Sequence, residues 1–240
     1  MGNFFEHLPE FIEKYSKAPT KGQLRLAREF LDIAHQDLKS SRVLYDAGIY
    51  NMAAYHLQQS VEKASKAFYV ILGVLDYKEI RKTSHDAPEL FFKMVEIPGI
   101  AEFAEFTKDV SGTEMVTDTS EARSVLSTKS KRVEIARLNA VQIDNWLSVI
   151  PKVEIQISPL STLMGADIIE FYIMTALRLY ILSSMTFPHE QGTHYPDCIV
   201  KPKEYTLNLG IIANISKVWN ETEIATSRIQ QFIDSAKSKK

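Results

Sequence analysis

The sequence predicts an all-α fold, an up-and-down helical bundle of about six to eight helices. Apolar residues recur every three or four positions through most of the chain, which is the spacing of one helix face. The alternation typical of strands is nearly absent, and its one short instance at residues 154–158 is too isolated to form a sheet. The 240 residues can bury a large core, and we expect one domain over residues 1–240.

The first 22 residues are predicted to form a short helix and a connector, because Pro9 and Pro19 interrupt the apolar pattern there. Glu6 and Glu10 stand where a secretion signal would carry its apolar run, so we expect no signal peptide.

A helical hairpin over residues 37–72 is the clearest element. Gly48 breaks the chain between its two helices, Asn51 is a suitable N-cap for the second helix, and Gly73 ends that helix. Because the break is short, we expect the two helices to pack antiparallel. The stripes predicted to be buried are Leu31, Ala34, Leu38, Ser41 and Tyr45 on the first helix, and Ala54, Leu57, Val61, Ala64, Phe68 and Ile71 on the second.

Residues 76–85 are polar and lack helical spacing, so they are predicted to form a loop. A new helix then opens at residues 86–88. Asp86 and Glu89 have the spacing of a capping box, and Pro88 fits a first helical turn.

The second half of the chain is predicted to contain two long helices and a central core helix. The central segment is apolar almost all round, but Asp167, Glu170 and Arg178 interrupt it, which favours a buried helix over a membrane span. The expected elements are a helix over residues 120–150 with a joint at 128–132, a connector at 149–159, the core helix at 160–184, a loop at 186–203 and a last helix at about 207–236.

Composition and charge set limits on function. The formal net charge of −2 gives no overall attraction to nucleic acid, so contact with a phosphate backbone requires a local patch. The single cysteine, Cys198, excludes an intramolecular disulfide framework and fits a reducing cytoplasm, where we expect the protein to reside.

Several short motifs resemble the signature of HEPN domains, the nucleotide-binding domains of higher eukaryotes and prokaryotes. Thr83-Ser84-His85-Asp86 looks like the family's "THDL" element, and Tyr195-Pro196-Asp197 is similar to its "RYPD" loop. The motifs of the hairpin are Asp37-Leu38, Gly48-Ile49-Tyr50, Ala53-Ala54-Tyr55-His56, Gln58-Gln59-Ser60-Val61-Glu62-Lys63 and Lys66-Ala67. Residues 95–185 match less clearly, and we interpret residues 95–158 as a helical insertion.

The resemblance implies a four-helix-bundle core, a homodimer, and nucleotide or RNA binding without a cofactor. It also implies a nucleotidyltransferase as partner in a toxin–antitoxin or defence module, or metal-independent ribonuclease activity. The alternative is a non-catalytic dimerisation or scaffold module. The family's ribonucleases carry an Arg and a His separated by four to six residues, whereas three residues separate Arg81 from His85 here, which weakens the ribonuclease interpretation.

Arg81 and His85 are the candidate catalytic residues. The start of a helix disfavours the imidazolium ion, so a neutral His85 can act as a general base. Arg81 can stabilise the negative charge that develops on the phosphorane. The alternative is that His85 and Asp86 only cap the helix. We assign nucleotide binding to His56, Gln59, Lys63, Lys66, Asp86 and Tyr195.

A polar stripe on the second hairpin helix carries most of these binding residues. Lysines in such a stripe can bind phosphates as point charges. Alternatively, Glu62 and Lys66 form an ordinary surface pair, the stripe is a solvated face, or it is a dimer surface. Asp37 is expected to reach His56 or Lys63 across the hairpin in a structural role.

Two further clusters are predicted to lack function. His189, His194, Asp197 and Cys198 fit no metal-ligand spacing, so we expect a polar loop and no metal. The basic run Arg123, Lys129, Lys131, Arg132 and Arg137 lacks interleaved aromatic residues and is predicted to be a solvated face; the alternative is that it follows an RNA backbone.

Overall fold

A computed structural model describes residues 18–75, 77–82, 129–164, 167–189 and 199–238 of the chain. The described residues form helices and no strand, which confirms the predicted all-α class. In chain order the elements are α2 (Lys21–Asp46), α3 (Tyr50–Leu72), α4 (Tyr77–Lys82), α8 (Lys129–Ala136), α9 (Ala140–Met164), α10 (Asp167–Thr186), the 3₁₀ helix η1 (Phe187–His189), the 3₁₀ helix η3 (Pro202–Glu204), α11 (Gly210–Ala213) and α12 (Ile215–Ser238).

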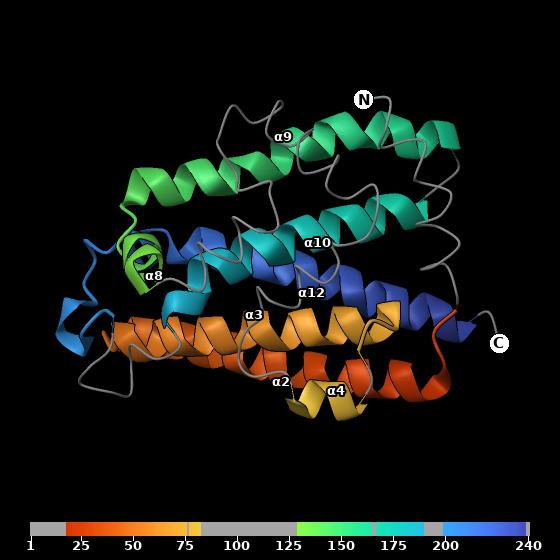
Figure 1. Cartoon of the computed structure of the whole chain (residues 1–240), viewed down its shortest axis with the longest axis horizontal. Coiled ribbons are helices and arrows are strands. Elements are labelled where there is room, and N and C mark those ends of the chain that lie inside the picture. Colours follow the sequence, from red (N-terminus) through yellow and green to blue (C-terminus); the bar gives the residue numbers. More distant parts are fainter. Residues whose placement is uncertain (1–17, 76, 83–128, 165–166, 190–198, 239–240) are drawn as a thin grey trace.

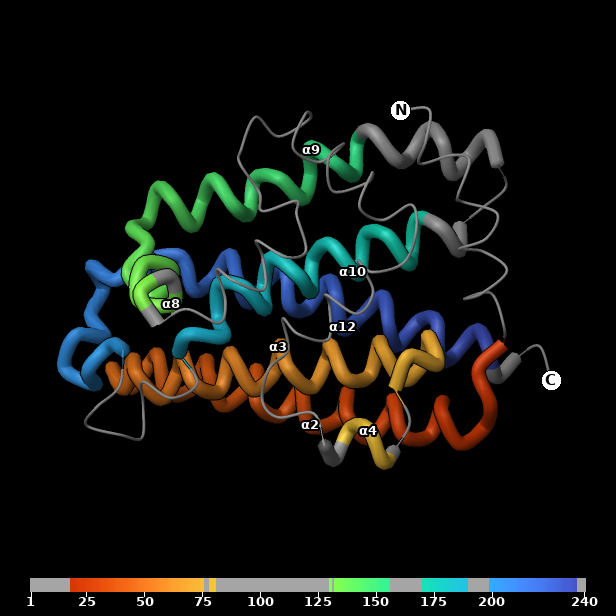
Figure 2. The backbone as a smooth tube through the Cα atoms, viewed as in Figure 1, coloured from red at the N-terminus to blue at the C-terminus, as the bar shows by residue number. Residues whose placement is uncertain are grey.

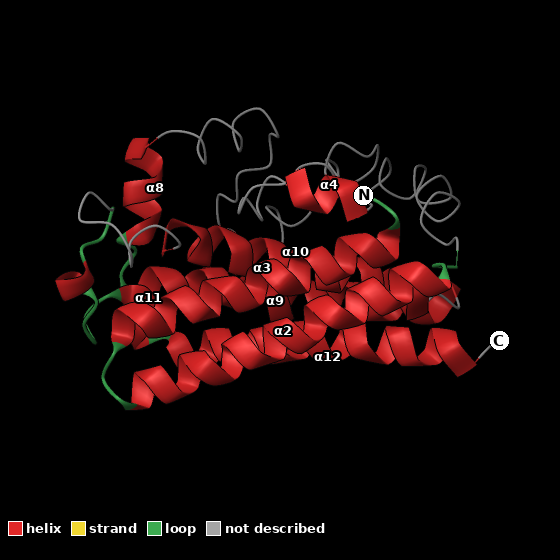
Figure 3. Cartoon of the chain, turned by 90° about the horizontal axis from the view of Figure 1, so that it is seen from below, coloured by secondary structure: helices red, strands yellow, loops and turns green. Residues whose placement is uncertain are grey.

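The long helices run roughly along one axis (Figure 1). The hairpin of α2 and α3 forms one side of the bundle, α10 and α12 lie next to it, and α9 lies on the far side. Figure 3 shows α8 crossing the direction of the bundle at one end. Since α10 contacts α3, α9 and α12, it is the central helix of the described fold.

The hairpin follows directly from its sequence. Thr20 caps α2: its Oγ1 accepts a hydrogen bond from the Gln23 backbone N–H at 3.2 Å, and Gln23 Oε1 accepts from the Thr20 backbone N–H at 2.8 Å. Gly48 and Gly73 have φ angles of 75° and 69°, in the left-handed region that glycine adopts without strain. The two predicted helix breaks are therefore confirmed.

Small side chains bring α2 and α3 close together. Ser41 Oγ donates to the Ala53 carbonyl, and Ser60 Oγ donates to the Ala34 carbonyl, each at 2.8 Å. Both hydroxyls are fully buried, so each bond links one helix to the backbone of the other. Trp219 of α12 joins the first of these links, because its Nε1 donates to Ser41 Oγ at 2.9 Å.

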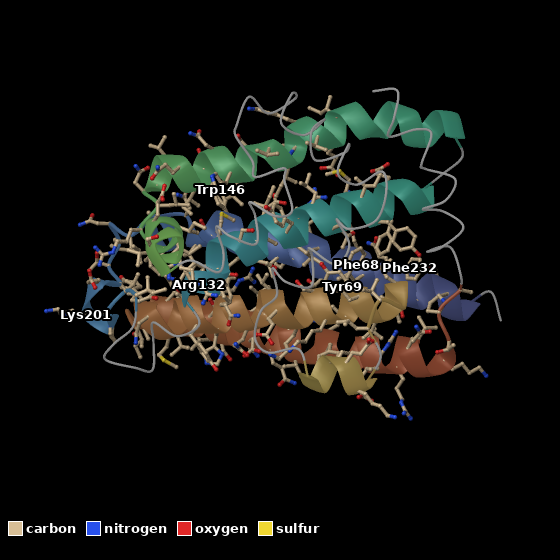
Figure 4. All side chains as sticks on the ribbon, viewed as in Figure 1. Phe68, Tyr69, Arg132, Trp146, Lys201 and Phe232 are labelled. Carbon is tan, nitrogen blue, oxygen red and sulfur yellow. The ribbon has the colours of Figure 1, made fainter. Side chains whose placement is uncertain are left out.

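An aromatic cluster closes the core between α3, α10 and α12. Phe68 lies 6.0 Å from Phe171, which stacks on Phe232 at 4.8 Å with ring planes 6° apart. Figure 4 shows Phe68, Tyr69 and Phe232 at the same end of the bundle. Such ring pairs stabilise a core beyond the apolar area that they bury.

A charge network joins α9, α10 and α12 about two turns further along the same face of α10. Arg178, which is 3% exposed, binds Glu154 of α9 at 2.8 Å and Glu221 of α12 at 3.1 Å. Arg228 of α12 binds the same Glu154 at 2.5 Å. The arginine that interrupts the apolar segment is therefore a structural residue of the core, consistent with the predicted burial of this segment.

The predicted connector at residues 149–159 is wrong. Helix α9 continues through Pro151 and Pro159 to Met164, so the brief strand considered at 154–158 is helix as well. A proline removes only one hydrogen bond, and here Val149, Ile150 and Val153 are fully buried around it. Packing of this buried face outweighs the local penalty.

Three of the predicted helices are divided in the structure. The long helix predicted over 120–150 breaks after α8, and Asn139 and Gln142 form reciprocal caps at the start of α9. The predicted last helix divides at Asn214, whose Nδ2 donates to the Ala140 carbonyl at 2.7 Å. The predicted core helix 160–184 also spans two elements, the end of α9 and nearly all of α10.

Two local predictions near the hairpin are also wrong. Ile49, not Asn51, is the N-cap of α3, and Asn51 lies inside the helix. The predicted loop at 76–85 contains the short helix α4. The predicted N-terminal helix and the helix opening at 86–88 lie outside the described residues. Among the described helices, none is long and apolar enough to cross a membrane.

Candidate functional site

Five polar residues on α3 form one connected group inside the hairpin, which we call the α3 polar cluster. Its members are Gln58, Gln59, Glu62, Lys63 and Lys66. The spacing of three and four residues places Gln59, Lys63 and Lys66 on one side of the helix, with Glu62 between them. The cluster contains three of the six residues predicted to bind nucleotide.

Glu62 is the central acceptor of the cluster. Its Oε1 accepts hydrogen bonds from Lys66 Nζ at 2.7 Å and from Lys63 Nζ at 3.1 Å. Its Oε2 lies 3.3 Å from Gln58 Nε2, and Lys63 Nζ also donates to Gln59 Oε1 at 2.9 Å. Gln59 donates in turn to Gln58 Oε1 at 2.6 Å. Each side chain is thus fixed by at least one other member.

The cluster lies in a poorly hydrated part of the bundle. The side chain of Glu62 is 0% exposed, whereas those of Lys66 and Lys63 are 9% and 16% exposed. Burial raises the pKa of Glu62, but the charges and hydrogen bonds of Lys63 and Lys66 lower it more, from 4.5 to about 2. Two ammonium groups therefore face one ionised carboxylate, and the five residues together carry one net positive charge.

His56 precedes Lys63 by seven residues, so both lie on the same face of α3. Its Nδ1 is 2.8 Å from Asp37 Oδ1, which confirms the predicted contact across the hairpin. Both side chains are partly exposed, at 26% and 18%. Asp37 thus fixes the orientation of the His56 ring at the edge of the cluster.

The predicted catalytic pair is only partly described. Arg81 lies in the last turn of α4. In Figure 2, the chain turns back after α3, and α4 lies below the hairpin in this view. His85, Asp86 and Tyr195 lie outside the described residues, so their assignment stays a prediction.

The interpretation of Glu62 and Lys66 as an ordinary surface pair is wrong, because both residues are buried. The sequence could not show this, since an i, i+4 pair has the same spacing on an exposed or a buried face. Reasoning from the sequence also omitted Gln58. The signal for it was the motif Gln58-Gln59-Ser60-Val61-Glu62-Lys63, in which it stands beside Gln59.

The predicted polar loop of possible metal ligands is wrong for His189. This residue is 1% exposed and its Nδ1 lies 3.0 Å from Tyr205 Oη. Burial lowers its pKa from 6.5 to about 4, so the ring is neutral at pH 7. The other three possible ligands lie outside the described residues, and the described part of the chain contains no metal-binding group of His, Cys, Asp and Glu side chains.

The predicted solvated basic face is wrong for Arg132 and confirmed for Arg137, the two members whose side chains are described. Arg132 of α8 lies over the Phe187 ring, 4.8 Å from the ring centre, and Arg137 binds Glu204 at 3.1 Å. Figure 4 shows Arg132 directed toward the bundle from the end that α8 closes. Arg132 therefore contributes to packing at this end of the molecule, whereas Arg137 is 55% exposed and forms a surface ion pair.

Comparison with known families identifies one domain. The family model of the HEPN domain matches residues 27–131, which confirms the resemblance predicted from the motifs. Among the described residues this range holds most of α2, all of α3 and α4, and the first residues of α8. No curated protein and no solved structure matched the chain.

Proposed function

Starting from the HEPN domain match over residues 27–131, we propose that this protein binds nucleotide or RNA phosphates through the α3 polar cluster. The observation that supports the proposal is the convergence of Lys63 and Lys66 on the single carboxylate of Glu62. One positive charge of the cluster lacks a negative partner within it. A phosphate oxygen supplies that partner.

The two lysines have different parts in the proposed site. Lys66 is held at 2.7 Å from Glu62 and is nearly enclosed, so it provides a fixed positive charge. Lys63 is more exposed and shares its ammonium group between Glu62 and Gln59. A lysine has a flexible stem and three donors, so Lys63 can turn to a phosphate while Lys66 keeps Glu62 ionised.

The remaining predicted residues complete the proposal. His56, held by Asp37, and Gln59 flank Lys63 and supply hydrogen bonds to the same ligand. We place Asp86 and Tyr195 at the nucleotide, and we assign any metal-independent RNA cleavage to Arg81 and His85. As partner we propose a nucleotidyltransferase, in a toxin–antitoxin or defence module, with the protein acting as a homodimer.

The binding proposal is tested with Lys63→Gln. This variant removes the positive charge but keeps an N–H donor that can bind the Gln59 side chain. Affinities for inorganic tripolyphosphate and for a short single-stranded RNA are measured by calorimetry at several salt concentrations. We expect a loss of about tenfold for both ligands and a smaller salt slope for RNA. Lys39→Gln, on the exposed face of α2, is the matched control and should leave both unchanged. Equal affinities for wild type and Lys63→Gln would contradict the proposal.

The partner and the activity require separate experiments. Co-expression with the nucleotidyltransferase of a neighbouring gene, if the genome holds one, should yield a stable complex and relieve growth inhibition. His85→Ala should abolish cleavage of RNA in the presence of EDTA. Unchanged cleavage by this variant would remove His85 from the mechanism and leave the binding proposal intact.

A further inference from the structure

A surface cavity of about 720 Å³ lies where the start of α2, the end of α3 and α4 meet. None of the predicted site residues lines it. Its walls are Thr20, Gly22, Gln23, Arg25, Leu26, Glu29, Val70, Gly73, Leu75 and Glu79. The volume lies within the usual range of small-ligand pockets, roughly 300 to 1,000 Å³.

The walls divide into an apolar floor and a polar rim. Val70 and Leu75 are 0% and 2% exposed, and Leu26 is partly buried beside them. Glu29 and Glu79 stand on the rim. Glu29 is 3.8 Å from Arg25, and both of these side chains are largely exposed, so water screens the pair and it holds the carboxylate only weakly.

This chemistry suits a nucleoside better than a phosphate. An apolar floor accepts the face of a base, and carboxylates accept hydrogen bonds from ribose hydroxyls and from exocyclic amino groups. The rim carries Arg25 beside Glu29 and Glu79, so these three side chains sum to one negative charge, which favours a neutral nucleoside over a phosphate. The cavity and the α3 polar cluster therefore favour opposite ends of a nucleotide.

The cavity lies on the same side of α3 as Lys63. Val70 follows Lys63 by seven residues, which places both on one helix face, about 10 Å apart along the axis. Figure 2 shows α4, which carries Glu79, running alongside this stretch of the hairpin. A ligand that spans about 10 Å along α3 would meet both sites.

We propose that this cavity binds the nucleoside part of a ligand whose phosphates meet Lys63 and Lys66. The inference rests on the proposed function and assigns the orientation of the nucleotide: base and ribose toward Leu26 and Val70, phosphates toward the middle of α3. Gly73 belongs to the same wall. A Cβ at this position would lie 3.3 Å from Gln23 Nε2, so a larger residue would press on the rim.

The test compares two cavity variants with a matched control on the full chain. Glu29→Gln removes the rim carboxylate at an exposed position, and Leu26→Trp fills the floor. Asp32→Asn makes the same type of change as Glu29→Gln on α2, outside the cavity. Adenosine, guanosine and inorganic tripolyphosphate are titrated separately by calorimetry, with Lys63→Gln as the second reference.

We expect at least one nucleoside to bind the wild type and to lose about tenfold in affinity in Glu29→Gln, and more in Leu26→Trp. Lys63→Gln and Asp32→Asn should leave nucleoside binding unchanged, and the cavity variants should leave tripolyphosphate binding unchanged. Because Glu29→Gln alters an exposed rim, it remains informative if Leu26→Trp fails to fold.

The results separate the two proposals. Tripolyphosphate binding that depends on Lys63, together with no nucleoside binding or with nucleoside affinity unaffected by the cavity variants, would overturn this inference alone. Failure of the wild type to bind any of the three ligands would overturn the proposed function as well.

Discussion

Lys66→Met is expected to destabilise the protein strongly, because it leaves the buried carboxylate of Glu62 with Lys63 as its one remaining lysine in the cluster. The pKa of Glu62 lies at about 2 instead of 4.5, a difference that corresponds to about 3 kcal/mol of stability at pH 7. Lys66 makes the shorter of the two ion pairs with Glu62, at 2.7 Å against 3.1 Å. Removing one partner of a buried pair costs about 3–5 kcal/mol in other proteins. We therefore expect a loss of about 3 kcal/mol.

The assay is urea unfolding followed by circular dichroism at pH 7 and pH 3. The pKa of Glu62 is lowered by folding, so its contribution is complete above pH 4.5 and disappears as the pH falls toward 2. The deficit of Lys66→Met should therefore be largest at pH 7 and smaller at pH 3. Lys39→Met, at an exposed position of α2, should change the free energy of unfolding by less than about 0.5 kcal/mol.

A double variant distinguishes loss of the ion pair from loss of packing. Glu62→Gln/Lys66→Met removes both charges, so it should cost less than the sum of the single variants by about 2 kcal/mol. A deficit for Lys66→Met below about 1 kcal/mol at pH 7, or one that does not change with pH, would refute this account of the cluster.

Three other predictions concern residues outside the cluster. Burial lowers the pKa of His189 to about 4, so stability should fall by about 3 kcal/mol as the pH drops from 6.5 to 4, and His189→Gln should lack this part of the pH dependence in urea titrations. Gly210→Ala should destabilise the protein by about 3 kcal/mol or more in thermal unfolding, since the new Cβ would lie 2.1 Å from the Leu138 carbonyl oxygen. An unchanged unfolding temperature would show that α11 and the α8–α9 joint separate easily. Ser41→Ala should cost about 1–3 kcal/mol and shift the fluorescence of Trp219, because the indole N–H loses its buried acceptor; an unchanged spectrum and midpoint would contradict that role.

The hairpin is the part of the fold that was predicted best from the sequence. The spacing of Leu31, Ala34 and Leu38 predicted a buried stripe, and Gly48 and Gly73 predicted the two breaks, all as the structure has them. These features depend on interactions within about four residues, which the sequence displays directly. The contact between Asp37 and His56 was predictable for the same reason, because a short turn fixes how the two helices face each other.

The second half of the chain was predicted less well. Pro151 and Pro159 favoured a connector, yet α9 continues through both, because Val149, Ile150 and Val153 are buried around the first of them. Asn214 divides the last helix where its side chain meets the Ala140 carbonyl, 74 residues away in sequence. Such decisions depend on residues distant in the chain, and no local pattern contains them.

The sequence by itself determined the helical class, the hairpin, its polar stripe and the resemblance of its motifs to HEPN domains. The tertiary structure decided whether this stripe is buried or exposed to solvent. Only packing of α3 within the bundle encloses Glu62 and Lys66, and this enclosure strengthens the interaction by which Lys66 lowers the pKa of Glu62. Likewise, the cavity exists because the ends of α2 and α3 and the helix α4 meet in space, which apolar spacing along any one of them does not specify.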